Sequence, residues 1–254
     1  MNFLRFTLLD IKRNALNFST IFSIVLMPIG FALLFGGMQE YGKYSFRDGN
    51  AAGYVMLGMS VFGACSAVSS LAGNAVMERA QGWNRQLALT AMTPVKLGIS
   101  KLCVAASLAT MSVVAVNSTV LYSQVKIPWN QQLACGAIAV VTSLIFVGYG
   151  LGVAGLFSSN RAASIATGLL VPLSFIGTVF SPLPLSLIDF ARFTPMYGVA
   201  QLVRWPFSGG TIVTADQQDF LLDEHLWVAL VNVGAWAIVF ALLAFAVNRR
   251  ATRR

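Results

Sequence analysis

Long apolar runs separated by short polar connections dominate the chain. Six of these runs approach or exceed the roughly 20 apolar residues that a helix needs to cross a bilayer. None of them alternates polar and apolar positions as the strands of a membrane barrel do. The pattern therefore predicts a single domain over residues 1–254, an all-α integral membrane protein with six transmembrane helices. The predicted spans are residues 18–38, 52–77, 102–124, 133–157, 162–180 and 226–247.

The segment before the first run, residues 1–16, has two unlike faces. Leu8 and Ile11 fall on one side of a helix, whereas Arg5 and Lys12 fall on another. This pattern is typical of a helix that lies in the membrane interface. We expect an interfacial helix here, and the open alternative is an inward extension of the first span.

The connection over residues 78–93 concentrates polar side chains in a chain that has few. Glu78, Arg79 and Arg85 lie there with the large, amphipathic Trp83. Only one glycine interrupts the stretch before a proline ends it, so we expect a short helix that starts at the end of the second span. Such a helix fits a docking contact for a soluble partner, and it also fits a charged helix at the membrane edge. The residue pattern leaves both interpretations open.

The connection over residues 181–206 is too apolar for a free loop. Pro182, Pro184 and Pro195 help to divide it into pieces that are too short to span the bilayer. We therefore expect a re-entrant or interfacial hairpin. The acidic stretch 214–225 that follows is expected to be a solvated helix or turn.

Two glycines in the fourth run, Gly148 and Gly152, are spaced four residues apart. Small residues at this spacing let two helices approach closely in a membrane. The motif is common in apolar segments, so we expect close packing within the chain rather than a seam between two copies.

The distribution of charged residues predicts how the chain is oriented in the membrane. The chain has 17 Lys and Arg residues against 9 Asp and Glu residues, and only 10% of it is charged, compared with about a quarter of a soluble domain. Most of the basic residues fall in connections on the side of the N-terminus, so both termini are expected in the cytoplasm. The basic excess favours contact with anionic membrane lipids. No basic face with stacking aromatic residues accompanies it, so no nucleic acid partner is expected.

Several catalytic and energy-coupling motifs are missing from the sequence. There is no P-loop, no G-x-S-x-G, no H-E-x-x-H and no paired cysteine motif. We therefore assign no catalytic residue, no cofactor-binding residue and no metal ligand. The spans also lack ionisable residues away from their ends, and coupled transporters keep such residues to carry the coupling. Energy for transport is expected to come from another polypeptide.

Two other function classes stay open at this point. A membrane enzyme that acts on lipids would need a cluster of carboxylates or histidine. The candidates, for which a solvated acidic helix end is the plainer interpretation, are Asp216, Asp219, Asp223, Glu224 and His225. The other class is an immunity or sensor protein without an ATPase partner.

Two segments resemble those of ABC-2 type transporter permeases. The stretch ERAQGWNRQLALTAMTP is similar to the family's E-R-x-x-G-x-x-x-x-L-x-x-T-P-x-x-P segment and departs from it at Ala91, where the family usually has Pro. The matching positions there are Glu78, Arg79, Gly82, Leu87, Thr90 and Pro94. The stretch PLPLSLIDFARFTPMYGVAQLVR resembles the family's proline-rich segment after the fifth span. It departs from the family at Met196-Tyr197, where the family more often has Leu-Thr-Tyr. The matching positions there are Pro182, Leu183, Pro184, Pro195, Met196 and Arg204.

The resemblance implies a transmembrane subunit of an ABC exporter in the bacterial cytoplasmic membrane. It implies a partner permease, a copy or a homologue, and separate ATPase subunits that hold ATP and Mg²⁺. Family substrates include amphipathic antibiotics, lipids, lipid-linked glycans and sodium ions, and the wording GWNRQL leans toward the drug-resistance branch. The implied ATPase-coupling residues are Glu78, Arg79, Gly82, Trp83, Arg85 and Leu87. The implied outer-gate residues are Pro182, Pro184, Pro195, Tyr197 and Arg204.

Overall fold

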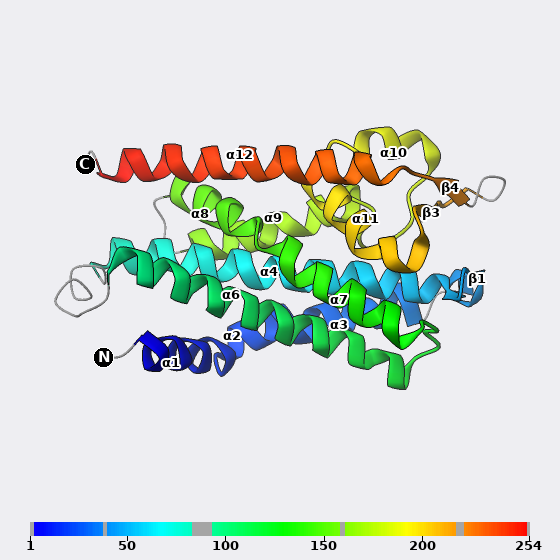
Figure 1. The fold of residues 1–254 in the computed structure, drawn as a ribbon, viewed down its shortest axis with the longest axis horizontal. Coiled ribbons are helices and arrows are strands. Elements are labelled where there is room, and N and C mark those ends of the chain that lie inside the picture. The colour runs from blue at the N-terminus through cyan, green and yellow to red at the C-terminus, as the bar shows by residue number, and fades with distance from the viewer. Residues whose placement is uncertain (1–2, 38–39, 83–92, 158–160, 217–220, 253–254) are drawn as a thin grey trace.

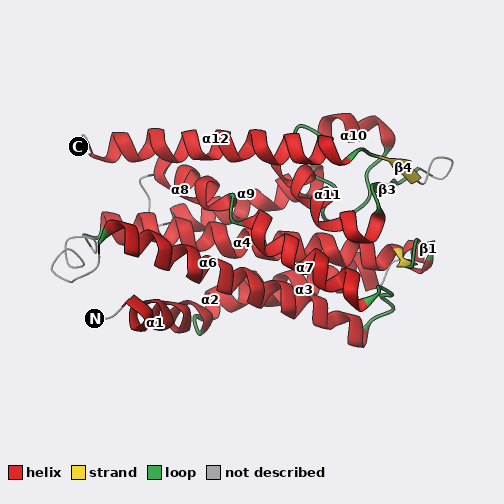
Figure 2. Cartoon of the chain, viewed as in Figure 1, coloured by secondary structure: helices red, strands yellow, loops and turns green. Residues whose placement is uncertain are grey.

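The computed structural model describes residues 3–37, 40–82, 93–157, 161–216 and 221–252, which form an elongated bundle of helices (Figure 1). Helix α1 (Phe3–Ala15) and the last turns of α12 (Leu226–Thr252) lie at the same end of the bundle. Two short β-hairpins lie at the opposite end (Figure 2). We call these the terminal end and the hairpin end.

Five helical segments are long and apolar enough to cross a membrane, which confirms five of the predicted spans. They are Phe18–Gly36, Ala51–Ala80, Pro94–Leu121, Trp129–Leu156 and Leu226–Arg249. The remaining predicted span, 162–180, is the shorter helix α9 (Ala162–Ile176) of 15 residues, about 22 Å long at 1.5 Å per residue. Thr178, just beyond α9, has a φ of 59°, so the chain leaves the helical path there.

Three of the spans are not continuous α-helices. The first alternates α-helix with π-helical turns, the third ends in a 3₁₀ turn, and the fourth is broken near Leu144. Hydroxyls of Thr142 and Ser143 bond back to carbonyls of their own helix just before that break, a contact that bends helices. The pieces are α2 (Phe18–Ile21), η1 (Phe22–Leu26), α3 (Met27–Ala32), η2 (Leu33–Gly37), α6 (Pro94–Asn117), η4 (Ser118–Tyr122), α7 (Trp129–Ser143) and α8 (Phe146–Leu156).

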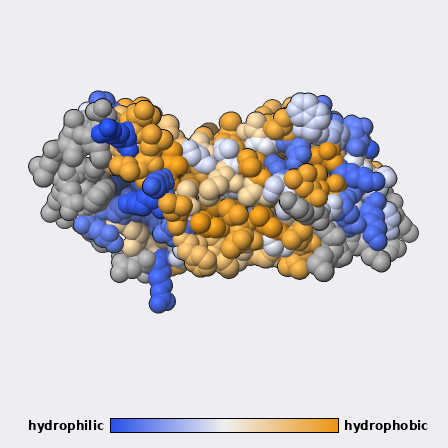
Figure 3. Space-filling model, turned by 90° about the horizontal axis from the view of Figure 1, so that it is seen from below, coloured by the Kyte–Doolittle hydropathy of each residue, from blue (hydrophilic) through white to orange (hydrophobic). Residues whose placement is uncertain are grey.

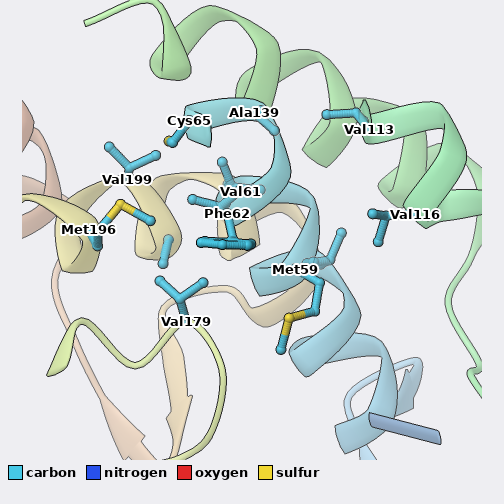
Figure 4. Packing of buried hydrophobic residues seen from close by; sticks show 14 of the residues in the cluster. Met59, Val61, Phe62, Cys65, Val113, Val116, Ala139, Val179, Met196 and Val199 are labelled. Atoms are coloured by element: carbon cyan, nitrogen blue, oxygen red, sulfur yellow. The ribbon is translucent and has the colours of Figure 1, made fainter. Parts of the chain in front are cut away.

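Helix α4 (Ala51–Ala80) is the centre of the bundle. Of its most apolar stretch, 94% is buried, and a helix that is apolar all round is expected in such a position. It contacts α6, α7, α8, α9 and the first span. Figure 4 shows its Met59 and Phe62 among side chains from these neighbours and from the hairpin end. A displacement of α4 would therefore displace most of the other helices.

The glycine pair in α8 packs closely against α12, as the sequence predicts. A Cβ at Gly148 would lie 3.0 Å from the carbonyl oxygen of Phe240, and one at Gly152 would lie 2.5 Å from Leu243 Cγ. No room exists for larger side chains, so the contact is within the chain.

The hairpin end is built from short elements. The β1–β2 pair is antiparallel with Ser45 opposite Asn50, and the β3–β4 pair is antiparallel with Thr211 opposite Asp223. The prediction of a helix or turn for 214–225 is wrong for its last part, because residues 221–223 pair with β3. These elements are η3 (Glu40–Lys43), β1 (Ser45–Phe46), β2 (Gly49–Asn50), α10 (Leu185–Ala191), α11 (Pro195–Ser208), β3 (Thr211–Val213) and β4 (Leu221–Asp223).

The surface divides along the long axis. Figure 3 shows apolar residues over the middle of one face and hydrophilic residues gathered toward both ends. A bilayer is apolar in its centre and polar at both surfaces. The long axis of the bundle therefore crosses the membrane, with the terminal end on one side and the hairpin end on the other.

Candidate functional site

At the terminal end, Glu78 and Arg79 belong to the last turn of α4. The first residues of the predicted coupling segment 78–93 are thus helical and continuous with the second span. Nothing between Met77 and Glu78 breaks a helix, so α4 continues until Gly82, whose φ of 81° ends it. Left-handed backbone of this kind is common at helix C-termini.

The rest of the predicted coupling segment is only partly described. Trp83, Arg85 and Leu87 lie outside the described residues. Beyond them, Thr93 Oγ1 accepts from Lys96 N at 3.3 Å and so caps α6, which Pro94 begins. The role of this segment stays a prediction.

Four charged side chains form a closed ring at the terminal end. Lys101 Nζ lies 2.9 Å from Asp10 Oδ2 and 3.0 Å from Glu78 Oε2. Arg13 Nη2 lies 2.9 Å from Asp10 Oδ1 and also contacts Glu78. Each acid thus has two basic partners and each base two acidic partners. We call these four residues the ion-pair ring.

The ion-pair ring joins three elements. Asp10 and Arg13 come from α1, Glu78 from the end of α4, and Lys101 from the start of α6. The Asp10 side chain is 6% exposed and the Glu78 side chain 19% exposed, so both carboxylates are largely withdrawn from water. Ion pairs that are partly withdrawn from water in a network hold geometry better than isolated surface pairs. The ring therefore links α1 to the segment that follows the second span.

Helix α1 packs on the bundle through a mixed face in which Phe6, Thr7 and Asp10 are buried. Thr7 Oγ1 and Ser100 Oγ of α6 lie 2.8 Å apart, and both side chains are buried. Leu4 and Leu8 are instead 66% and 55% exposed. The outward face mixes these leucines with the exposed Arg5 and Lys12, which fits a helix at the boundary between lipid and water. The helix that the sequence predicts is thus confirmed, and its place at the membrane interface stays a prediction.

At the hairpin end, Arg204 of α11 is completely buried. Its Nε donates to the Tyr54 carbonyl at 3.0 Å, and its Nη1 and Nη2 donate to the carbonyls of Thr178 at 2.9 Å and Val179 at 3.1 Å. The guanidinium also stacks over the Tyr54 ring at 3.9 Å. One side chain thereby joins α11 to the first turn of α4 and to the turn that follows α9. Buried cations need such a set of acceptors.

The Arg204 contact depends on a glycine. A Cβ at Gly58 of α4 would lie 2.1 Å from the Val179 oxygen and 2.3 Å from Arg204 Nη2. Contacts below 3.0 Å force atoms to move. Gly58 therefore leaves the space in which the guanidinium meets the turn.

Tyr197 makes a second connection in the same helix. Its hydroxyl donates to Glu224 Oε2 at 2.6 Å, and Arg192 Nε donates to the same oxygen at 2.8 Å. Burial raises the pKa of the Tyr197 phenol, and the hydrogen bond to Glu224 raises it further. The phenol therefore stays protonated and remains a donor.

The prolines of the outer segment start its helices. Pro184 precedes α10, and Pro195 is the first residue of α11, a position where the missing N–H costs nothing. Pro182 lies in the turn before them. Helix α11 then packs among α4, α7 and α12, so the segment 181–206 returns into the bundle.

The carboxylates considered for an enzyme site are used separately. Asp216 Oδ2 accepts from Leu185 N at 2.7 Å, and Asp223 Oδ1 accepts from Thr211 Oγ1 at 2.8 Å. Asp219 lies outside the described residues. Within the part of the chain that the structure describes, no three His, Cys, Asp or Glu side chains are grouped to hold a metal ion.

Sequence reasoning missed Asp10, Arg13 and Lys101 as members of a site. Their signal was only that each lies near the end of an apolar run, where charges usually face water. Their pairing across three elements becomes visible only when the helices are packed.

Comparison with protein families gives one result over most of the chain. The sequence model of the family described as ABC-2 type transporter matches residues 2–207. This range includes the ion-pair ring and Arg204. No curated protein matches the chain.

Proposed function

Because the chain belongs to the ABC-2 type transporter family and is therefore a transmembrane component of an ABC transporter, we propose that it is an exporter permease driven by a separate ATPase subunit. The terminal end would face the cytoplasm and the hairpin end the outside. A second permease, a copy or a homologue, would complete the pathway. The cargo would be a hydrophobic or amphipathic compound such as a drug, an antibiotic or a lipid, because the described spans offer an apolar interior.

The observation that supports this proposal most is the ion-pair ring. A force applied by an ATPase to residues 81–93 would reach Glu78 first, since Glu78 lies in the last turn of α4. The ring would carry it to α1 and α6 at once. Coupling between sites requires an element with two arrangements that both sites bias. We assign that role to α1, α4 and α6 moving as one unit.

The proposal is tested with Glu78→Gln and Trp83→Ala. The full chain is co-expressed and purified with a candidate ATPase subunit and reconstituted, and ATP hydrolysis and ATP-dependent transport of a fluorescent amphipathic dye are measured together. In each variant the rate of transport should fall about tenfold, because losing roughly 1.4 kcal/mol of coupling free energy lowers a rate by that factor. Hydrolysis should continue, because the ATPase site lies in the other subunit.

The matched control is Lys12→Gln, which removes an exposed charge of α1 that does not belong to the ring. Its transport should equal that of the parent protein. Unchanged transport in both Glu78→Gln and Trp83→Ala would contradict the coupling role. Transport of the dye without any nucleotide would overturn the dependence on an ATPase.

A further inference from the structure

A cavity of about 210 Å³ opens at the hairpin end. It lies between the segment before α4 and the connection from η4 to α7, and Lys43, Ser45, Gly49, Asn50, Gln124 and Lys126 line it. None of these side chains is acidic. The proposed transport path and the ion-pair ring do not use any of them.

The walls of the cavity are held in place by Asn50, which is 5% exposed. Its Nδ2 donates to the Gln124 carbonyl at 2.7 Å, and its Oδ1 accepts from Lys126 N at 2.9 Å and from Gly53 N at 3.1 Å. The backbone N–H of Asn50 also donates to the Lys126 carbonyl at 3.2 Å. Two segments far apart in sequence are thus fixed before any ligand arrives, which lowers the entropic cost of binding.

Close backbone contact completes this construction. A Cβ at Gly49 would lie 2.1 Å from the Lys126 oxygen. Only glycine lets the β2 strand approach the connection this closely. The cavity is therefore a built feature of the hairpin end rather than a gap between loose loops.

The chemistry of the lining favours an anion. Lys43 and Lys126 both line the cavity, and neither forms an ion pair with any side chain that the structure describes. Two basic residues at one cavity with no acidic residue in its lining favour an anion as the occupant. Ser45 lines the cavity too and carries a hydroxyl, which is a hydrogen-bond donor. Phosphate oxygens accept from groups of these kinds.

The position of the cavity points to the membrane surface. Asn50 directly precedes α4, and Lys126 precedes α7 by three residues. Trp129 and Leu121 nearby are 74% and 77% exposed, as expected for side chains that face lipid, and Trp is enriched where the hydrocarbon meets the headgroups. Lysines at this level lie where lipid phosphates lie.

We propose that this cavity binds the phosphodiester headgroup of an anionic lipid, with Lys43 and Lys126 on either side of the phosphate. A cavity of about 210 Å³ accommodates a phosphate together with its glycerol arm. The two acyl chains would lie along the exposed apolar surface beside Leu121 and Trp129. The bound lipid would fix the β1–β2 hairpin against the ends of the spans.

The test measures equilibrium binding of fluorescent phosphatidylglycerol to the full chain in a neutral detergent, with phosphatidylcholine, whose choline cation cancels the phosphate charge, as the zwitterionic comparison. Phosphatidylglycerol should bind the parent protein more tightly. The double variant Lys43→Gln/Lys126→Gln should weaken this binding about tenfold or more, because it removes both charge-assisted hydrogen bonds to the phosphate. The Lys43→Arg/Lys126→Arg variant should still bind phosphatidylglycerol more tightly than phosphatidylcholine. This variant keeps both positive charges, so it distinguishes loss of charge from a change in the fold.

Two further measurements test whether general charge attraction or free phosphate explains the binding. The double variant Lys12→Gln/Lys96→Gln removes two exposed lysines elsewhere, so it matches the change in net charge and should bind as the parent does. Equal weakening in this variant would mean general attraction and would overturn the site. Displacement by millimolar inorganic phosphate, with no preference between the two lipids, would overturn the lipid as its ligand. Equal binding by the Lys43/Lys126 glutamine variant would overturn the cavity itself.

Discussion

At the scale of single residues, Arg204 and Gly58 form one unit. The guanidinium holds three carbonyl groups, one of which belongs to Thr178 with its positive φ. Such backbone is uncommon for a β-branched residue and persists when surrounding contacts hold it. Gly58 provides the space. Resemblance to a family pointed to Arg204, whereas nothing in the sequence pointed to Gly58.

We predict that Gly58→Ala destabilises the protein by about 1–3 kcal/mol, the usual cost of inserting a methyl group where no space exists. Thermal unfolding in detergent measures this as a lower midpoint. The matched control is Gly168→Ala in α9, where an added Cβ meets nothing within 4 Å. That variant should keep or raise the midpoint, because alanine favours helix. Equal midpoints for the two variants would contradict the contact between Gly58 and Arg204.

At the scale of elements, α1 packs on the bundle through a face that combines buried polar residues with Phe6. Its acid Asp10 and base Arg13 meet α4 and α6, while its leucines remain outside. Periodicity alone predicted the helix, because a 3.6-residue repeat is local. It could not predict which face packs on protein, since in a membrane the apolar face can turn toward lipid.

A double-mutant cycle tests this attachment. Arg13→Gln and Glu78→Gln, made singly and together, should show a coupling free energy of about 1 kcal/mol in thermal or denaturant unfolding. The same cycle between Lys12→Gln and Glu78→Gln should give a coupling near zero, since Lys12 is exposed outside the ring. Coupling of equal size in both cycles would mean that the ring does not hold α1.

At the scale of the whole molecule, the apolar middle and the hydrophilic ends define a membrane-crossing axis (Figure 3). The axis has no direction of its own. The distribution of basic residues predicts the direction, with the terminal end in the cytoplasm. Six spans were expected, and α9 is shorter than expected because Gly177 and Thr178 turn the chain away.

Cysteine labelling of intact cells tests the direction. In a background without the exposed Cys103, Ala215→Cys at the hairpin end should react with a membrane-impermeant maleimide added outside. Gln81→Cys at the terminal end should react only after the cells are permeabilised. Both residues are exposed in the structure. The reverse pattern would place the termini outside and would contradict the proposed direction of export.

The sequence by itself determined the class of this protein, since apolar runs of bilayer length need no tertiary contact to be recognised. It also marked breaks in the chain at Pro94, Pro184 and Pro195, because proline acts through its own backbone, although the structure shows that Pro94 and Pro195 begin helices. Only the tertiary structure decided that Glu78 pairs with Arg13 and Lys101, that Arg204 meets Tyr54, and that two distant lysines share one cavity. These contacts join segments far apart in the chain, and packing of whole helices, not local preference, brings them together.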